Sequence, residues 1–208
     1  YIDEHMTALT NLAKLYESIN MPEQAIEVWD TKRLMLEKLK NKTTTQYEEL
    51  LSVYTTLGTY FETIAMFDQA INTLKMALEE IANMGTNRSS AFRTSIADYQ
   101  ISITFHIANI YFKRNEFEKA VEYFEKNLDF GRMHNRIQVQ NQALTCLGNT
   151  YLAMSKLYEQ SAKSEQAQTN RTKRILSQSI QRTKDDYISK ALHYQRMAMR
   201  MKATPVNK

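Results

Sequence analysis

The stretch CLGNTYLAM, from Cys146 to Met154, places a glycine inside a segment that otherwise has the composition of a helix. Glycine in a helix interior costs about 1 kcal/mol relative to alanine, so its presence asks for a reason. A side chain reduced to hydrogen lets a second helix approach closely, and such packing can outweigh the propensity cost. Gly148 therefore predicts a helix–helix contact.

Three other stretches share this pattern, in which an apolar residue precedes a Gly or Ala and an aromatic residue follows the small one three positions later. The four small–aromatic pairs are Ala13 and Tyr16, Gly58 and Phe61, Ala108 and Tyr111, and Gly148 and Tyr151. Their small residues are 45, 50 and 40 positions apart, which indicates an internal repeat.

A second small residue follows the first by 12 positions in three copies, at Ala25, Ala70 and Ala120. In the fourth copy the matching residue is Ala191, which lies 43 positions after Gly148. Facing small residues on two segments predict a pair of helices in each copy. The extra residues, at about 161–184, are rich in Ser, Gln, Thr and basic residues. They form either a charged extension of the neighbouring helices or a flexible loop, and we favour a partly helical segment.

The 208 residues include only 4 Gly and 2 Pro, so we expect an all-α chain with few interruptions. We expect eight helices, at about 2–19, 22–40, 44–64, 67–84, 90–114, 116–132, 135–158 and 185–202. The repeats then span about 2–40, 44–84, 90–132 and 135–202 of a single domain, 1–208. Because Tyr1 already lies within a helical pattern, we expect the chain to be a piece of a larger protein.

This pattern resembles the tetratricopeptide repeat family, most clearly in NLAKLYESINMPEQAIEVW (11–29) and TLGTYFETIAMFDQAINTLKMAL (56–78). The resemblance implies a right-handed superhelix of about four antiparallel helix pairs, whose concave face is lined by the first helix of each repeat. The long repeats, and RIQVQNQALTCLGNTYLAM (136–154) in particular, are similar to the Pins/LGN-type adaptors and, less closely, to kinesin light chain.

The resemblance also implies a groove for a protein or peptide segment. Its positions in the first two repeats fall on Thr7, Thr10, Lys14, Glu17, Ser18, Ser52, Thr55, Thr59, Glu62 and Thr63. In the last two repeats the groove positions that we single out are Phe105, Asn109, Phe112, Lys113, Gln142, Asn149 and Leu152. Asn109 and Asn149 match the family asparagines that hold a ligand backbone, a role that suits a carboxamide because it offers both a donor and an acceptor.

Charge is distributed unevenly along the chain. Residues 1–160 carry 16 Lys and Arg against 20 Asp and Glu, whereas residues 161–208 carry 11 against 3. The basic tract within the insertion consists of Arg171, Lys173, Arg174, Arg182 and Lys184. It is either ordinary solvated surface or a site for an acidic protein surface. The absence of aromatic residues within the tract disfavours single-stranded nucleic acid.

Catalysis and cofactor binding find no support in the sequence. The four histidines, at 5, 106, 134 and 193, follow no metal-ligand spacing, and no glycine-rich phosphate loop is present. We therefore expect neither metal nor cofactor, and an enzyme would require a pocket that joins His106 to a carboxylate. The single Cys146 favours a reducing, cytoplasmic setting, and no apolar run approaches the ~20 residues of a membrane span.

The preferred hypothesis is a non-catalytic scaffold or adaptor that holds a partner segment in its groove. A cytoskeletal or ciliary assembly is the setting that fold-level analogy suggests. The alternative is a regulatory sensor whose superhelix responds to a bound peptide.

Overall fold

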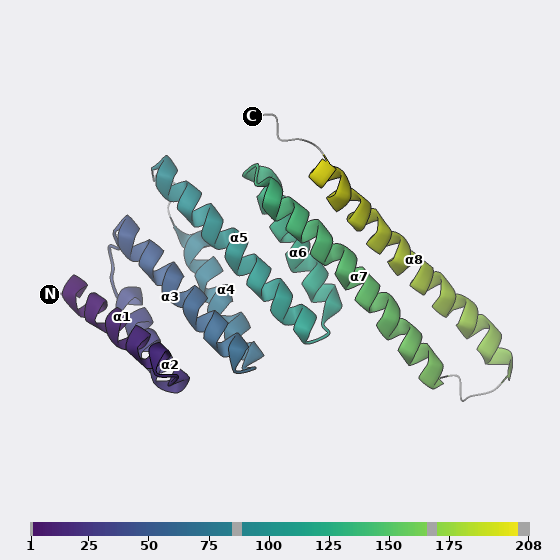
Figure 1. The fold of residues 1–208 in the computed structure, drawn as a ribbon, viewed down its shortest axis with the longest axis horizontal. Coiled ribbons are helices and arrows are strands. Elements are labelled where there is room, and N and C mark those ends of the chain that lie inside the picture. The colour runs from purple at the N-terminus through teal and green to yellow at the C-terminus, as the bar shows by residue number, and fades with distance from the viewer. Residues whose placement is uncertain (1, 85–88, 166–169, 204–208) are drawn as a thin grey trace. The chain divides into compact units, whose positions relative to one another are not determined.

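The computed structural model describes residues 2–84, 89–165 and 170–203, and every regular element in these ranges is an α-helix (Figure 1). The helices are α1 (Ile2–Ser18), α2 (Pro22–Glu37), α3 (Thr44–Thr63), α4 (Phe67–Asn83), α5 (Ser90–Lys113), α6 (Phe117–Met133), α7 (Ile137–Glu165) and α8 (Asn170–Ala203). The expected all-α fold is confirmed. The first six helices begin and end within three residues of the predicted positions.

Local sequence explains where these helices start and stop. Pro22 begins α2 at a position where its missing N–H costs nothing. Thr43 caps α3, because its hydroxyl accepts the Gln46 N–H at 3.2 Å while the Gln46 side chain accepts the Thr43 N–H at 3.1 Å.

The turns within the first three repeats share one geometry. Asn20, Ala65 and Asn115 adopt the left-handed conformation, with φ values of 58°, 61° and 59°. The next residue in each turn donates its N–H to the carbonyl oxygen of the repeat's aromatic residue, at 2.8–2.9 Å for Tyr16, Phe61 and Tyr111. This bond closes the Schellman motif at the end of a helix. The aromatic residue of the repeat therefore also marks the last turn of the first helix.

The fourth repeat lacks this turn. Its matching position is Ser155, which is buried and lies inside α7. No Gly or Pro occurs between Gly148 and Pro205, so nothing in the sequence breaks the helices there. Within the described residues the insertion therefore extends α7 to Glu165 and begins α8 at Asn170. The predicted ends at 158 and 185 were wrong for this reason.

The chain forms two compact units, Tyr1–Ile110 (unit 1) and Tyr111–Lys208 (unit 2). Unit 1 holds α1 to α4 and most of α5, and unit 2 holds the last turn of α5 with α6, α7 and α8. The organisation of residues 1–208 as one solenoid domain stays a prediction.

Helices that are neighbours in the sequence form several packed pairs within each unit. In unit 1, α2 packs on both α1 and α3, and α3 also packs on α4; in unit 2, α7 packs on both α6 and α8. The small repeat residues lie in these cores: Ala13, Ala25, Ala70, Ala108 and Ala120 are fully buried, and Ala191 nearly so. Gly58 and Gly148 are buried as well.

Candidate interaction groove

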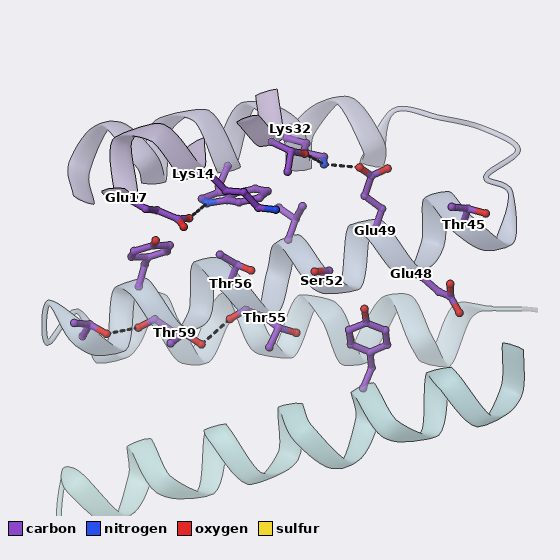
Figure 2. Close-up of a pocket in the computed structure, with 16 residues that line it drawn as sticks. Lys14, Glu17, Lys32, Thr45, Glu48, Glu49, Ser52, Thr55, Thr56 and Thr59 are labelled. Carbon is purple, nitrogen blue, oxygen red and sulfur yellow. Dashed lines mark hydrogen bonds and ion pairs between the residues drawn. The ribbon is translucent and has the colours of Figure 1, made fainter. Parts of the chain in front are cut away.

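A groove of about 880 Å³ lies in unit 1 (Figure 2). Its lining comes from α1, α2 and α3, together with Tyr99 of α5. Seven of its sixteen lining residues carry aliphatic hydroxyls: Thr10, Thr45, Ser52, Thr55, Thr56, Thr59 and Thr63. The first helix of each of two repeats supplies most of this wall, as expected for a concave face.

A line of threonines on α3 gives the groove its chemical character. Thr55, Thr59 and Thr63 recur every four residues and so share one helix face. Each donates its hydroxyl proton to the carbonyl four positions earlier, at 2.8, 2.9 and 2.8 Å. Such bonds are common for threonine within helices. Because the proton is engaged, each oxygen offers acceptor lone pairs to the groove, beside a methyl group.

A buried lysine joins the three helices below the groove. Lys32 of α2 is 2% exposed. Its ammonium group donates to the Thr10 hydroxyl of α1 at 2.5 Å and forms an ion pair with Glu49 of α3. The Trp29 ring lies beside it, with Nζ 5.6 Å from the ring centroid. These contacts compensate a charge that would otherwise be costly to bury, so Lys32 and Glu49 act as a structural pair.

Glu17, elsewhere in the wall of the groove, is held by hydrogen bonds from two aromatic side chains. Its carboxylate accepts the Trp29 indole N–H at 2.8 Å and a hydrogen bond from Tyr60. Burial, together with this bond and the nearby negative charge, raises the pKa of Tyr60 to about 12. The phenol therefore stays protonated at neutral pH.

Two charged lining residues differ from these. Lys14 and Glu48 line the groove, and neither forms an ion pair or hydrogen bond with another residue of the described chain. Figure 2 shows them toward opposite ends of the groove.

A smaller cavity of about 490 Å³ continues the groove between α3 and α5. It shares Thr55 and Tyr99 with the groove and adds further hydroxyls from Thr94, Ser95 and Ser102. Burial is the main cause that raises the pKa of Tyr99, with the charge of Glu48 adding to it and a hydrogen bond with Ser52 opposing it. The polar lining thus extends from α1 to α5.

The predicted groove residues fall into several environments. Lys14 and Thr59 line the groove, as do Thr10, Glu17, Ser52, Thr55 and Thr63 from the wider set of positions. Phe105 and Asn109 are half-buried on α5 and line neither cavity.

The remaining predicted groove residues belong to unit 2. Phe112 packs edge-on against Phe117 of α6, with ring centroids 5.4 Å apart, and Lys113 is exposed at the end of α5. Exposed positions on α7 hold Gln142, Asn149 and Leu152. Because Asn109 and Asn149 belong to different units, their joint grip on a ligand stays a prediction.

His106 does approach a carboxylate, since its Nδ1 lies 3.7 Å from Oε2 of Glu62. Neither residue lines the groove or the smaller cavity. The pocket that an enzyme would need to join these two groups is therefore not formed by either cavity.

The basic tract lies on α8. Arg182 is exposed, whereas Lys184 forms an ion pair with Glu159 of α7 at 2.9 Å. The side chains of Arg171, Lys173 and Arg174 lie outside the described part of the structure. Lys184 therefore helps to hold the long α7–α8 pair together.

The sequence analysis did not predict two contacts between helices in the wall of the groove, the Lys32–Glu49 ion pair and the Trp29–Glu17 hydrogen bond. Lys32 and Trp29 are three residues apart on α2 and so share a face with the repeat alanine Ala25. The position of Lys32 on the apolar face of α2 could have indicated a buried lysine. Its partners, Thr10 on α1 and Glu49 on α3, depend on how the helices pack and cannot be read from the sequence.

Among the described residues, no helix combines the length and the apolar composition that a membrane span requires. The same residues contain no group of three or more His, Cys, Asp or Glu side chains arranged to hold a metal ion.

Comparison with known proteins supports a repeat architecture. The sequence profile of the tetratricopeptide repeat matches residues 102–130. No curated protein matches the sequence significantly.

Among solved structures, BtubC (BKLC) from P. vanneervenii superposes with a TM-score of 0.55 at 16% identity, covering 97% of this chain and 81% of that one. A protein from Podosopora anserina, described as a putative kinesin light chain with nearly identical TPR-like repeats, gives a TM-score of 0.49 at 11% identity, with 98% of each chain covered. The similarity to Pins/LGN-type adaptors stays a prediction. The profile match at residues 102–130 and the superposition on BtubC show that the chain has a helical repeat fold similar to that of tetratricopeptide repeat proteins.

Proposed function

We propose that this chain is a non-catalytic interaction scaffold, and that it holds an extended segment of a partner protein in the groove of unit 1. Tetratricopeptide-type repeats generally act as protein-interaction scaffolds. The observation that carries the proposal for this particular face is the groove of about 880 Å³ lined by Ser and Thr hydroxyls of α1 and α3.

The chemistry of the wall supports an extended segment over a helix. Helical segments satisfy their own backbone N–H groups, whereas extended ones present them outward. The hydroxyl oxygens of Thr55 and Thr59 accept such N–H groups without first breaking a hydrogen bond of their own. Methyl groups between these oxygens contact the apolar parts of the segment.

The test combines partner capture with removal of the hydroxyls. The chain is used as bait in a pull-down, and crosslinking mass spectrometry then identifies the partner and the face that it contacts. In the double variant Thr55→Val, Thr59→Val, side-chain size is kept and two acceptors are lost. We expect binding of the captured partner to weaken about tenfold, since each lost hydrogen bond contributes roughly 0.5–1.5 kcal/mol.

Thr31→Val is the matched control for this experiment. Thr31 is exposed on α2, makes the same kind of bond to the carbonyl of Glu27 at 2.8 Å, and does not line the groove. Full binding by the Thr55→Val, Thr59→Val variant, or crosslinks confined to other faces, would rule out this groove as the partner site.

Asn109 and Asn149 are tested in the same assay. We expect Asn109→Ala with Asn149→Ala to weaken partner binding while helicity and the melting temperature stay unchanged. Unaltered affinity would remove these two residues from the binding surface.

We also infer that the basic tract attracts a second, acidic protein surface. Neutralising Arg171, Lys173 and Arg174 should then flatten the dependence of partner binding on ionic strength, because screening acts on exposed charges. An unchanged salt dependence would assign the tract to ordinary solvated surface.

A cytoskeletal or ciliary assembly in the cytoplasm is the proposed setting, by analogy with other repeat adaptors. The proteins captured in the pull-down test this directly. Cytoskeletal or ciliary components are expected, and reproducible capture of partners from an unrelated compartment would contradict it.

A further inference from the structure

We propose that the groove of unit 1 selects partner segments with opposite charges at its two ends: a basic side chain that meets Glu48 and a carboxylate that meets Lys14, about five extended residues apart. This inference rests on the proposed function and names the chemistry of the segment.

The preference for a segment with two opposite charges follows from which charged groups of the groove already form ion pairs or hydrogen bonds within the chain. Five charged residues line it: Lys14, Glu17, Lys32, Glu48 and Glu49. Lys32 and Glu49 form an ion pair with each other. Glu17 accepts hydrogen bonds from Trp29 and Tyr60.

Lys14 and Glu48 remain without an ionic partner among the described residues. Lys14 is exposed and Glu48 half-buried, so both can be reached by a ligand. The groove thus presents one ammonium group and one carboxylate that have no ionic partner or hydrogen bond among the described residues (Figure 2). The Glu17 carboxylate near Lys14 keeps its negative charge, but it already accepts hydrogen bonds from Trp29 and Tyr60.

Repeat geometry sets the separation of the two groups. Lys14 follows Ala13 as Thr59 follows Gly58, so Lys14 and Thr59 occupy the same register in successive repeats. Thr59 and Glu48 are 11 residues apart on α3, which corresponds to about 16 Å along the helix. An extended chain advances about 3.3 Å per residue. A basic and an acidic residue five positions apart therefore span the two ends.

Segments of uniform charge fit this groove less well. A segment with two basic residues matches Glu48 but brings a like charge to Lys14, and a segment with two acidic residues does the reverse. Discrimination therefore comes from repulsion at the mismatched end as well as from attraction at the matched one.

The test uses three synthetic peptides with acetylated and amidated ends, built of Ser and Gly with two charged residues five positions apart. The pairs are Lys with Glu, Lys with Lys, and Glu with Glu. Trp29 is the only tryptophan of the chain and lines the groove, so its fluorescence reports occupancy in the full chain. Chemical shifts of the α3 amides give a second readout for weak binding.

We expect the wild-type chain to bind the Lys–Glu peptide about fivefold more tightly than either uniform peptide at low salt, with the preference shrinking as salt is added. Lys14→Glu should shift the preference to the Lys–Lys peptide, and Glu48→Lys should shift it to the Glu–Glu peptide. Circular dichroism confirms that each variant keeps its helicity.

Lys38→Glu and Glu79→Lys are the matched controls, because both residues are exposed, lie outside the groove and undergo the same charge changes. Both controls should keep the wild-type preference. Equal binding of the three peptides, or variants that keep the wild-type preference, would overturn the charge selection while leaving the groove as a binding site. A lack of binding by all three peptides would also overturn the charge selection. The proposed function has its own test, because it fails only if the Thr55→Val, Thr59→Val variant binds the captured partner fully or the crosslinks lie on other faces.

Discussion

The α3–α4 pair of unit 1 and the α7–α8 pair of unit 2 carry the same Leu-Gly-x-x-aromatic motif, yet the two glycines meet different neighbours. A Cβ atom added at Gly58 would lie 2.6 Å from Cδ2 and 2.7 Å from Cγ of Leu74. At Gly148 it would lie 2.9 Å from Cγ of Gln195 and 3.3 Å from the carbonyl oxygen of Ala191.

Leu74 follows Ala70 by four residues, as Gln195 follows Ala191. The geometry of the helix pair is therefore shared, and the side chain one turn beyond the alanine makes the difference. Leu74 is fully enclosed in the core of unit 1, whereas Gln195 is half-buried and can rotate toward solvent. The Leu-Gly-x-x-aromatic motif thus produces the same helix pairing in both units, but we expect a residue larger than glycine to be tolerated better at position 148 than at position 58.

The largest effect that follows from this comparison is the cost of Gly58→Ala. The new methyl group would overlap both Cγ and Cδ2 of the buried Leu74 side chain, and such overpacking costs about 1–3 kcal/mol. Gly148→Ala should change stability by less than about 1 kcal/mol, because the gain in helix propensity offsets the displacement of Gln195. Chemical denaturation of each variant measures the difference, and equal costs at the two sites would contradict the comparison.

A second contrast concerns the turns that follow α1 and α3. Ala65 follows α3 with a left-handed φ of 61°, whereas the matching residue after α1 is Asn20, with a φ of 58°. Alanine is strained in this conformation, and asparagine and glycine are tolerated better. Ala65→Asn should therefore stabilise the chain by about 0.5–1 kcal/mol.

Asn20→Ala is the matched reverse substitution and should destabilise the chain by a similar amount. Thermal unfolding of the two variants beside the wild type measures both changes. A destabilising Ala65→Asn would show that backbone strain is not what limits stability at this turn.

The smallest effect appears at high pH, where both units contain a tyrosine close to a glutamate. Burial and Glu17 raise the pKa of Tyr60 to about 12, and burial with the charge of Glu125 raises that of Tyr194 to about 12. A raised pKa in the folded state means that the folded chain retains the proton more strongly than the unfolded chain. Each tyrosine therefore contributes stability that is fully present below pH 10 and is lost as the pH rises toward 12.

Tyr60→Phe and Tyr194→Phe should each make the decline in stability between pH 10 and 12 less steep. Denaturation midpoints across this range check the expectation for each unit. A decline equally steep in both variants would assign the alkaline loss of stability to other groups.

Sequence patterns predicted the helices well where local chemistry decides them. Pro22 and Asn20 identify one turn, and the repeat spacing locates the others. The long α7 and α8 were less accessible, although the lack of Gly and Pro between 148 and 205 was a usable signal.

Prediction of the site was more uneven. Repeat register places Lys14 and Thr59 on one face, and the structure finds both in the groove. The Lys32–Glu49 pair and the Trp29–Glu17 bond join residues on different helices, so they depend on the angle and offset at which the helices pack. A single sequence contains no direct measure of that offset.

A double-mutant cycle at Gly58 and Leu74 tests most directly the central claim that small residues are present because a neighbouring helix occupies their space. Leu74→Ala alone should destabilise the chain by about 2–5 kcal/mol. In that background the space is open, so adding Gly58→Ala should cost nothing or stabilise the chain by up to about 1 kcal/mol. An unchanged cost of Gly58→Ala in the two backgrounds would contradict the account.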